Sequence, residues 1–360
     1  MSYFRVASSE SQIDKIIDSA FQFNESFESS IFATTALVAT AGVAAADVGL
    51  SGLAQMGLQG GSTMETQFVQ DIDVTFSMSG STDNGLSFGA AVDLDEDAGA
   101  VGTDDAGVAI FVRGDFGTLT MGDTDGAMDW ALTEAGAMGN PGSINDNETT
   151  HAGLGGDANN FGDGSYDGQI LRYDYSMGDF GVAVSVEMDE TSVRDNGYAV
   201  GFTYGMDIGG GSVDLGLGYQ TAIYATDEDG VIEVANIALL FADGADVEVE
   251  TDVIGASAAV ALDNGLSAGL QYSLWELTSG GESSDVAHTG VAVGYTIDAL
   301  TVSANWGQFN PDGDGENITG YGVAVAYDLG GGLGVHGGYG FSDVDDVETS
   351  TWSVGVAMSF

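Results

Sequence analysis

Carboxylates dominate the side chains of this sequence that could do chemistry. The chain holds 56 Asp and Glu residues against 5 Lys and Arg, for a formal net charge of −51 at pH 7. A nucleic-acid partner is excluded, because neutralising phosphates requires basic side chains that are scarce here. The chain has no cysteine, so it offers neither disulfide bonds nor thiol chemistry.

One group of acids lies in a segment, residues 124–167, that is unlike its surroundings. It is rich in Gly, Asn and Asp and lacks the two-residue alternation of apolar and polar residues found on both sides. A loop longer than about 12–15 residues is uncommon in a compact domain unless it is functional or disordered. We therefore expect this loop to have a function. Its candidate site residues are Asp125, Asp129, Glu134, Asp146, Glu148, Asp157 and Asp163.

Calcium binding is the only cofactor chemistry that the acids suggest. Asp312, Asp314 and Glu316 form an acidic cluster, and calcium takes its ligands from flexible loops rich in carboxylate oxygens. The spacing of this cluster does not follow that of an EF-hand loop, so it is a weak candidate. No other cofactor is expected.

Catalysis has little support. The three histidines, His151, His288 and His336, are scattered along the chain, and no serine or acid is fixed near them by sequence. No glycine-rich phosphate motif follows a strand and opens a helix. We predict that the protein is not an enzyme and that His336 lines the interior of the fold.

The rest of the chain alternates apolar and polar residues, as strands with one apolar and one polar face do. In residues 68–79, for example, Ile72 and Phe76 fall on one face while Asp71 and Asp73 fall on the other. Glycine, at 57 residues, is about twice as frequent as usual, which argues against a helical protein. Sixteen strands are predicted, at residues 48–58, 68–79, 86–93, 108–113, 118–123, 169–177, 181–189, 196–205, 212–222, 251–262, 265–276, 286–297, 299–308, 317–327, 332–341 and 351–360.

Short and long connections alternate between these strands, which is typical of an up-and-down barrel. The segment Val231–Phe241 is apolar enough to be a further strand or a short helix, and either would lie in an unusually long fifth loop. An even number of strands closed into a barrel satisfies every backbone group in a membrane. Sixteen strands also make a barrel too wide for side chains to fill, so we expect a water-filled interior.

Alternation alone does not distinguish a soluble β-sandwich from a membrane barrel, because the two differ only in which face meets the core. An export signal favours the membrane. The apolar run at residues 31–46 is too short to span a bilayer and ends in Ala44, Ala45 and Ala46, as a signal-peptide cleavage site does. Aromatic residues near strand ends, such as Tyr175 and Trp352, favour it as well. The predicted fold is an all-β, transmembrane, antiparallel up-and-down β-barrel.

Three parts of the chain follow from this interpretation. Residues 1–30 form an atypical leader, residues 31–46 are the apolar region and cleavage site of a signal peptide, and residues 47–360 form the barrel. The leader is atypical because Glu25 and Glu28 precede the apolar run, where basic residues are usual. The alternative is an N-terminal amphipathic helix that packs on the barrel.

Several stretches resemble a known family. They are FSMSGSTDNGLSFGAAV (76–92), GDFGTLTMGDTDGA (114–127), LRYDYSMGDFGVAVS (171–185) and AYDLGGGLGVHGGYGFSD (326–343), together with the terminal Phe360. They resemble the general diffusion porins of the Rhodobacter type, from alphaproteobacteria. The resemblance implies a sixteen-stranded homotrimer in the outer membrane of a Gram-negative bacterium. It also implies that residues 124–167 are the constriction loop, which folds into the barrel.

The chain departs from that family in its basic residues. The family sets loop carboxylates against a basic cluster on the barrel wall, whereas the chain from Asp47 on has only Arg113, Arg172 and Arg194. Arg113 and Arg172 either pair with loop acids and hold the loop against the wall, or neutralise nearby Asp174 or Asp115. The candidate pore-wall residues are Asp71, Asp73, Asp93, Arg113, Arg172, Asp174, Glu187 and Asp214.

The resulting expectation is a passive outer-membrane channel for small hydrophilic solutes and ions. Rings of carboxylates favour cations over anions, so the channel should prefer cations. The expected partners are two further copies of the chain, outer-membrane lipid and lipopolysaccharide. The main alternative is a secreted, acid-rich soluble β protein, such as a surface-layer or adhesion module, and a barrel enzyme is a third.

Overall fold

The computed structural model describes residues 47–95, 108–146, 148, 151–154, 170–188, 195–225, 231–234, 237–240, 248–312, 317–344 and 346–360. The predicted leader and signal peptide, residues 1–46, lie outside these residues. So do four of the predicted site residues, Asp157, Asp163, Asp314 and Glu316, and also Arg194.

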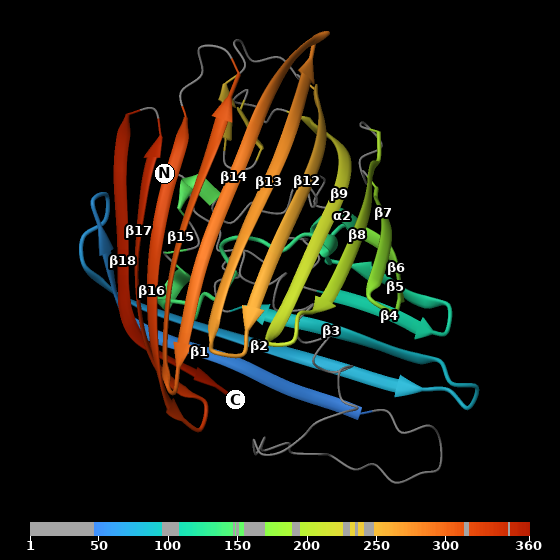
Figure 1. Cartoon of the computed structure of the whole chain (residues 1–360), viewed down its shortest axis with the longest axis horizontal. Coiled ribbons are helices and arrows are strands. Elements are labelled where there is room, and N and C mark those ends of the chain that lie inside the picture. Colours follow the sequence, from blue (N-terminus) through green and yellow to red (C-terminus); the bar gives the residue numbers. More distant parts are fainter. Residues whose placement is uncertain are drawn as a thin grey trace.

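Sixteen of the described strands close into a single antiparallel barrel, as the sequence predicts (Figure 1). Each strand pairs with its neighbour in the chain, and β1 closes the barrel against β18 with Gly57 opposite Gly355. The strands are β1 (Asp47–Gly61), β2 (Gln67–Ser81), β3 (Ser87–Asp95), β4 (Val108–Gly114), β5 (Gly117–Gly122), β6 (Ile170–Met177), β7 (Phe180–Glu187), β8 (Gly197–Asp207), β9 (Gly211–Ala225), β12 (Glu248–Leu262), β13 (Leu266–Ser279), β14 (Glu282–Ile297), β15 (Leu300–Pro311), β16 (Ile318–Gly330), β17 (Leu333–Val344) and β18 (Val347–Ser359).

The segment that the sequence left open, Val231–Phe241, contains two short strands. β10 (Val231–Val234) and β11 (Ile237–Leu240) pair with each other in a hairpin that is separate from the barrel sheet. The long connection from β9 to β12 therefore carries strand rather than helix, and the barrel closes without it.

The two faces of the barrel strands differ as a membrane requires. On β13, Leu270, Tyr272 and Leu274 point outward and are exposed, whereas Gln271 and Ser273 between them point inward and are fully buried. The same alternation runs around the barrel, with large apolar side chains outside. An apolar outer face is stable only against lipid, so the expected inside-out arrangement is confirmed. No helix among the described residues is long and apolar enough to span a bilayer.

One region of the inner wall is apolar, which the sequence analysis did not anticipate. Val253, Trp275, Leu277, Val286 and Phe309 point inward from β12–β15 and are buried together. They lie toward the ends of these strands at which β13 turns into β14, where the barrel wall rises highest in Figure 1. The interior is therefore not uniformly polar.

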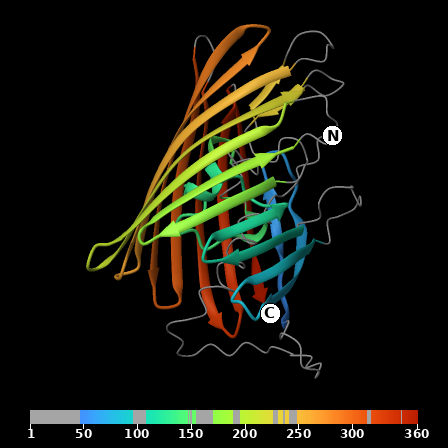
Figure 2. The ribbon, with the colours of Figure 1, turned by 90° about the vertical axis from the view of Figure 1, so that its right-hand side faces the viewer.

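The described part of the long loop after β5, residues 124–146, 148 and 151–154, enters the barrel (Figures 1 and 2). We call it the inner loop. Its described part contains a short helix, α2 (Ala127–Ala131), and two 3-10 turns, η1 (Ile144–Asp146) and η2 (Ala152–Leu154). Helix α2 contacts β6–β9, η2 contacts β14–β17, and η1 contacts β17, β18, β1 and β2. The loop thus follows the inside of the wall around much of the barrel.

Candidate pore constriction

The inner loop is amphipathic. Its apolar residues between 127 and 135 recur at helical spacing, and α2 begins there. Asp125, Asp129 and Glu134 stay partly exposed, while the apolar residues are buried against the wall. The buried apolar residues of the loop are Ala127, Met128, Ala131, Leu132, Ala135, Met138, Ile144 and Leu154. Residues 127–135 therefore turn their apolar side to the barrel wall, and Asp125, Asp129 and Glu134 stay partly exposed.

Glycines at inward positions of the strands make room for this loop. A Cβ added at Gly218 would lie 2.6 Å from Cγ of Met128, and one at Gly290 would lie 2.9 Å from Cβ of Ala135. Such separations are too short, so any larger residue would displace the loop. We call this set the glycine seat: Gly201, Gly216, Gly218, Gly255, Gly269, Gly290, Gly294, Gly307, Gly320, Gly322, Gly338 and Gly355.

The sequence analysis missed the glycine seat, although a signal was present. The seat lies at the inward phase of strands β8, β9 and β12–β18, where an ordinary pore wall would carry polar side chains. Glycine in a strand often marks a site where another segment of backbone approaches closely. Recurrence of glycine at one phase of successive strands would have predicted the path of the loop.

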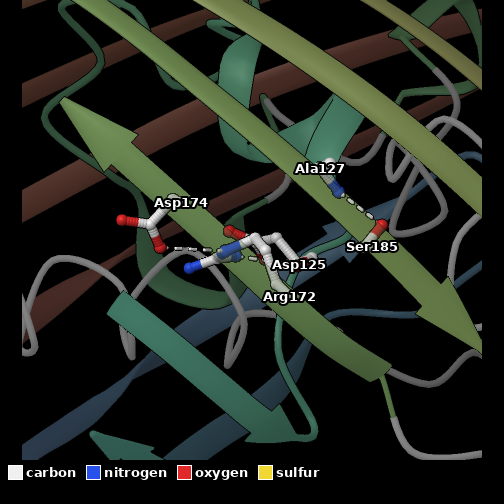
Figure 3. Close-up of polar contacts among 5 residues, drawn as sticks. All are labelled: Asp125, Ala127, Arg172, Asp174 and Ser185. Atoms are coloured by element: carbon white, nitrogen blue, oxygen red, sulfur yellow. Dashed lines mark hydrogen bonds and ion pairs between the residues drawn. The ribbon is translucent and has the colours of Figure 1, made fainter. Parts of the chain in front are cut away.

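Inward side chains of three strands satisfy backbone N–H groups of the loop. Ser185 Oγ accepts a hydrogen bond from the amide of Ala127 at 2.8 Å, as Figure 3 shows. Further along, Ser257 Oγ accepts from the amide of Thr133 at 2.8 Å, and Gln271 Oε1 accepts from the amide of Ala135 at 2.9 Å. A buried backbone N–H without a partner is costly, so these side chains fix the loop in register with the wall.

Arg172 ties the start of the loop to β6 (Figure 3). Its Nη1 donates a hydrogen bond to the backbone oxygen of Asp125 at 2.7 Å, and its Nε lies 3.7 Å from a carboxylate oxygen of Asp174. The buried guanidinium therefore combines both roles that the sequence left open, holding the loop and partly neutralising Asp174. Arg113 is exposed at the end of β4, opposite Thr118, which in turn lies opposite Asp174.

All three histidines of the chain lie where the loop meets β14–β17. His336 Nδ1 is 2.9 Å from the backbone oxygen of Gly142, and His288 Nε2 is 3.1 Å from that of Gly153. Because a carbonyl oxygen only accepts, each of these ring nitrogens carries the proton and donates. His151, in the loop itself, bonds through Nε2 to Oδ1 of Asn305 at 3.0 Å. The histidines anchor the loop.

The other predicted wall residues lie apart from one another. Asp71 and Asp73 point inward from β2, a strand that η1 contacts. Glu187 is buried on β7, where it lies opposite Ile170 of β6 in the sheet. Asp214 lies apart, in a pocket at the short-turn ends of β7–β12. The remaining wall acid, Asp93, lies on β3, and its side chain is outside what the structure describes.

The predicted calcium cluster falls largely outside the described residues. Asp312 follows the end of β15, and the structure does not describe Asp314 or Glu316. Within the described part of the chain, no three His, Cys, Asp or Glu side chains are grouped so as to hold a metal ion. Calcium binding stays a prediction.

Comparison with known proteins identifies the family. The family model described as Gram-negative porin matches residues 33–347. The chain belongs to the Gram-negative porin family. A porin from Rhodobacter capsulatus is 29% identical over 326 residues, which cover 87% of this chain and 100% of that protein.

Solved structures agree with the porin fold. A porin structure refined at 1.8 Å resolution is 26% identical, with a TM-score of 0.67, and the match covers 87% of this chain and all of the other. The trimer form of OmpT, an outer membrane protein of Vibrio cholerae, is 14% identical, with a TM-score of 0.64 over 88% of this chain and all of the other. At that identity OmpT supports the fold alone.

The predicted resemblance to Rhodobacter-type porins is therefore confirmed, and the porin is a channel of the Gram-negative outer membrane. The alternative of a secreted soluble β protein is rejected, because the family and the apolar outer face both require a membrane. Porins are channels, which is consistent with the expectation that this chain is not an enzyme.

Proposed function

We propose that this porin lets small hydrophilic solutes and ions diffuse passively, and that it prefers cations. The observation that carries the proposal is the orientation of the inner loop. Its apolar side is buried on the glycine seat, so its acids Asp125, Asp129 and Glu134 are left partly exposed on the other side. No energy source is implied, and solutes move down their gradients.

The barrel wall supplies little positive charge to offset these acids. Of its two described arginines, Arg172 is buried and bound to the loop, and Arg113 lies at the far end of β4. Asp71 and Asp73 on β2 add negative charge to the same interior. A pore lined by charge of one sign concentrates ions of the opposite sign, so cations should pass more readily than anions.

Reversal potentials in planar bilayers test this proposal. Under a gradient of potassium chloride, the sign of the potential should be that of a cation-selective channel. The preference should weaken as salt rises, because the Debye length falls from about 8 Å at physiological ionic strength to about 3 Å at 1 M. An anion-selective sign at low salt would refute the proposed preference.

A matched pair of variants locates the charges responsible. The triple variant Asp125→Asn, Asp129→Asn, Glu134→Gln should shift the potential toward zero. The control is Glu276→Gln with Asp285→Asn, since these two acids are exposed neighbours on the outer face of β13 and β14. The control should leave the potential unchanged. Equal potentials in wild type and triple variant would show that the loop acids do not line the pore.

We further propose that the porin is a homotrimer that contacts lipid through its outer apolar face and lipopolysaccharide near the long connections. The trimer form of OmpT supports the oligomeric state by similarity of fold only. Mass measurement in detergent, with and without heating, tests it. A single-chain mass before heating would contradict the trimer.

A further inference from the structure

Glu148 occupies an unusual place for a carboxylate. Its side chain is fully buried between the inner loop and the wall, and neither of its oxygens has a partner with hydrogen-bond geometry among the described residues. The other described acids of the loop remain partly exposed. Glu148 is therefore the one described loop acid whose charge would be taken out of water when the loop docks.

The wall beneath Glu148 is shaped to receive it. Glu148 lies over Gly322 of β16 and Gly338 of β17, where a Cβ would collide with its backbone and carboxylate respectively. Its backbone oxygen accepts a hydrogen bond from Nδ2 of Asn305 at 3.1 Å. Oδ1 of the same Asn305 side chain accepts a hydrogen bond from His151 Nε2, so Asn305 of β15 holds both Glu148 and His151. Moving Glu148 off the wall therefore breaks the contacts of His151 as well.

Little around Glu148 could neutralise a negative charge. From the loop it faces Asp146, a like charge, and the neutral side chains of Ser143 and Asn140, whose polar groups lower its pKa by less than burial raises it. β15 offers Asn305 and β16 a glycine; on β18, Ser353, opposite Gly338, has a buried hydroxyl oxygen without a partner. β17 carries His336, which is engaged with Gly142. The described arginines, Arg113 and Arg172, are on β4 and β6 instead.

The protonation states follow from this environment. Burial, with a smaller contribution from the charge of Asp146, raises the pKa of Glu148 from 4.5 to about 7. Burial lowers the pKa of His151 from 6.5 to about 4. Between these two values both groups are neutral, and the docked interface holds no buried charge from either.

We propose that Glu148 is a protonation switch: its neutral form keeps the loop around Glu148 and His151 docked on β14–β17, and its ionised form releases it. Because the folded acid has a raised pKa, docking is strongest below pH 4.5 with respect to this group. Docking weakens as pH rises and carries the full penalty above about pH 7. This rests on the proposed function, since the loop must bound the pore for its release to alter conduction.

Cysteine labelling of the intact porin in detergent or liposomes tests release directly, because the natural chain has no cysteine. Leu154→Cys places a thiol at a fully buried position of η2, and Ala137→Cys places one at an exposed position of the same loop. The ratio of their labelling rates cancels the ionisation of the thiol itself. We expect the ratio to rise about tenfold for each pH unit as pH increases toward about 7, and to level off above that value.

The decisive variant is Glu148→Gln, which keeps the shape and removes the ionisation. In this background the labelling ratio should stay flat between pH 5.5 and 8.5, while Glu134→Gln, at a partly exposed loop acid, should leave the rise in place. The same pH dependence with and without Glu148 would overturn the proposal. So would a flat ratio in the chain that retains Glu148, a measurement that does not depend on how the Gln variant folds.

Single-channel recordings extend the test to conduction. Conductance and current noise should rise as pH increases toward about 7 in the unmodified porin, level off above that value, and show no such rise in Glu148→Gln. The reversal potential of both porins, measured at the same pH, reports on cation preference separately. Loss of the pH effect with an intact potential would count against the switch alone, and an anion-selective potential would count against the proposed function alone.

Discussion

Two parts of the inner loop are held on the same wall by different means. Residues 125–138 rest on β6–β13 through buried apolar side chains, and their amides donate to Ser185, Ser257 and Gln271. The described residues of 142–154 rest on β14–β18 through His151, Glu148 and the two histidines of the wall. The second part contains Glu148, whose pKa burial raises to about 7. We therefore expect the docking of residues 125–138 to be independent of pH and that of the described residues of 142–154 to depend on pH.

The largest effect should come from removing an apolar anchor of residues 125–138. Met128 is fully buried, so Met128→Ala should cost about 2–5 kcal/mol of stability. The loss should be the same at pH 5.5 and 8, because no titrating group is involved. Thermal unfolding in detergent measures it. The control, Met188→Ala at a methionine that is 56% exposed, should have little effect on stability. A loss of stability at Met128→Ala that depends on pH would contradict the distinction between the two parts of the loop.

Acid should weaken the docking of the described residues of 142–154 and leave the docking of residues 125–138 unchanged. The folded pKa of His151 is lowered, so its contribution to docking is complete above pH 6.5 and is lost as pH falls toward about 4. The loss is on the order of 3 kcal/mol, since one pKa unit corresponds to about 1.4 kcal/mol. Current noise between pH 6.5 and 3.5 should increase, and His151→Gln should reduce that increase, with His288 beside Gly153 retaining a share of it. An unchanged acid response in the variant would assign it to another group.

Filling the glycine seat should narrow the pore. Gly338→Ala places a methyl group against Ser143 and Glu148, and overpacking of this kind costs about 1–3 kcal/mol. The displaced loop should also lower single-channel conductance. The matched control is Gly337→Ala, one residue away on the outer face, where an added Cβ would meet its nearest atom only at 3.5 Å. Equal conductance in the two variants would show that the seat does not set the opening.

The smallest effect should follow loss of one hydrogen bond from residues 125–138. Ser185→Ala removes the acceptor of the Ala127 amide and should cost about 1 kcal/mol. The effect should be independent of pH, unlike that of Glu148→Gln. Unfolding temperatures at pH 5.5 and 8 check this, with Ser185→Thr expected to retain part of the bond. A larger loss at pH 8 than at pH 5.5 would contradict a neutral anchor.

Much of the fold could be predicted because strand geometry is local. Successive side chains of a strand point to opposite faces, so the alternation of Leu270, Gln271 and Tyr272 reports which residues share a face. The number of strands and the inward course of the loop followed from this periodicity and from the family resemblance. The inward apolar cluster around Trp275 and Phe309 was missed, because inward apolar residues give the same local signal as outward ones.

The candidate site was less predictable, because its geometry depends on contacts between distant residues. Arg172 was expected at the loop, and it does bind Asp125, but through the backbone oxygen, which no residue type reveals. The histidines were treated as scattered residues, yet each ends at the loop–wall interface. His151 and Asn305, for example, are separated by 154 positions in the chain.

The sequence by itself determined the barrel and the sign of its charge, since both depend on residue types and a two-residue period that every strand repeats. Only the tertiary structure decided what each loop acid does. Asp129 and Glu148 belong to one loop and carry the same group, yet one stays partly in water and the other is buried over Gly322 and Gly338. The reason is that burial, and with it the pKa, is set by which strands the loop crosses.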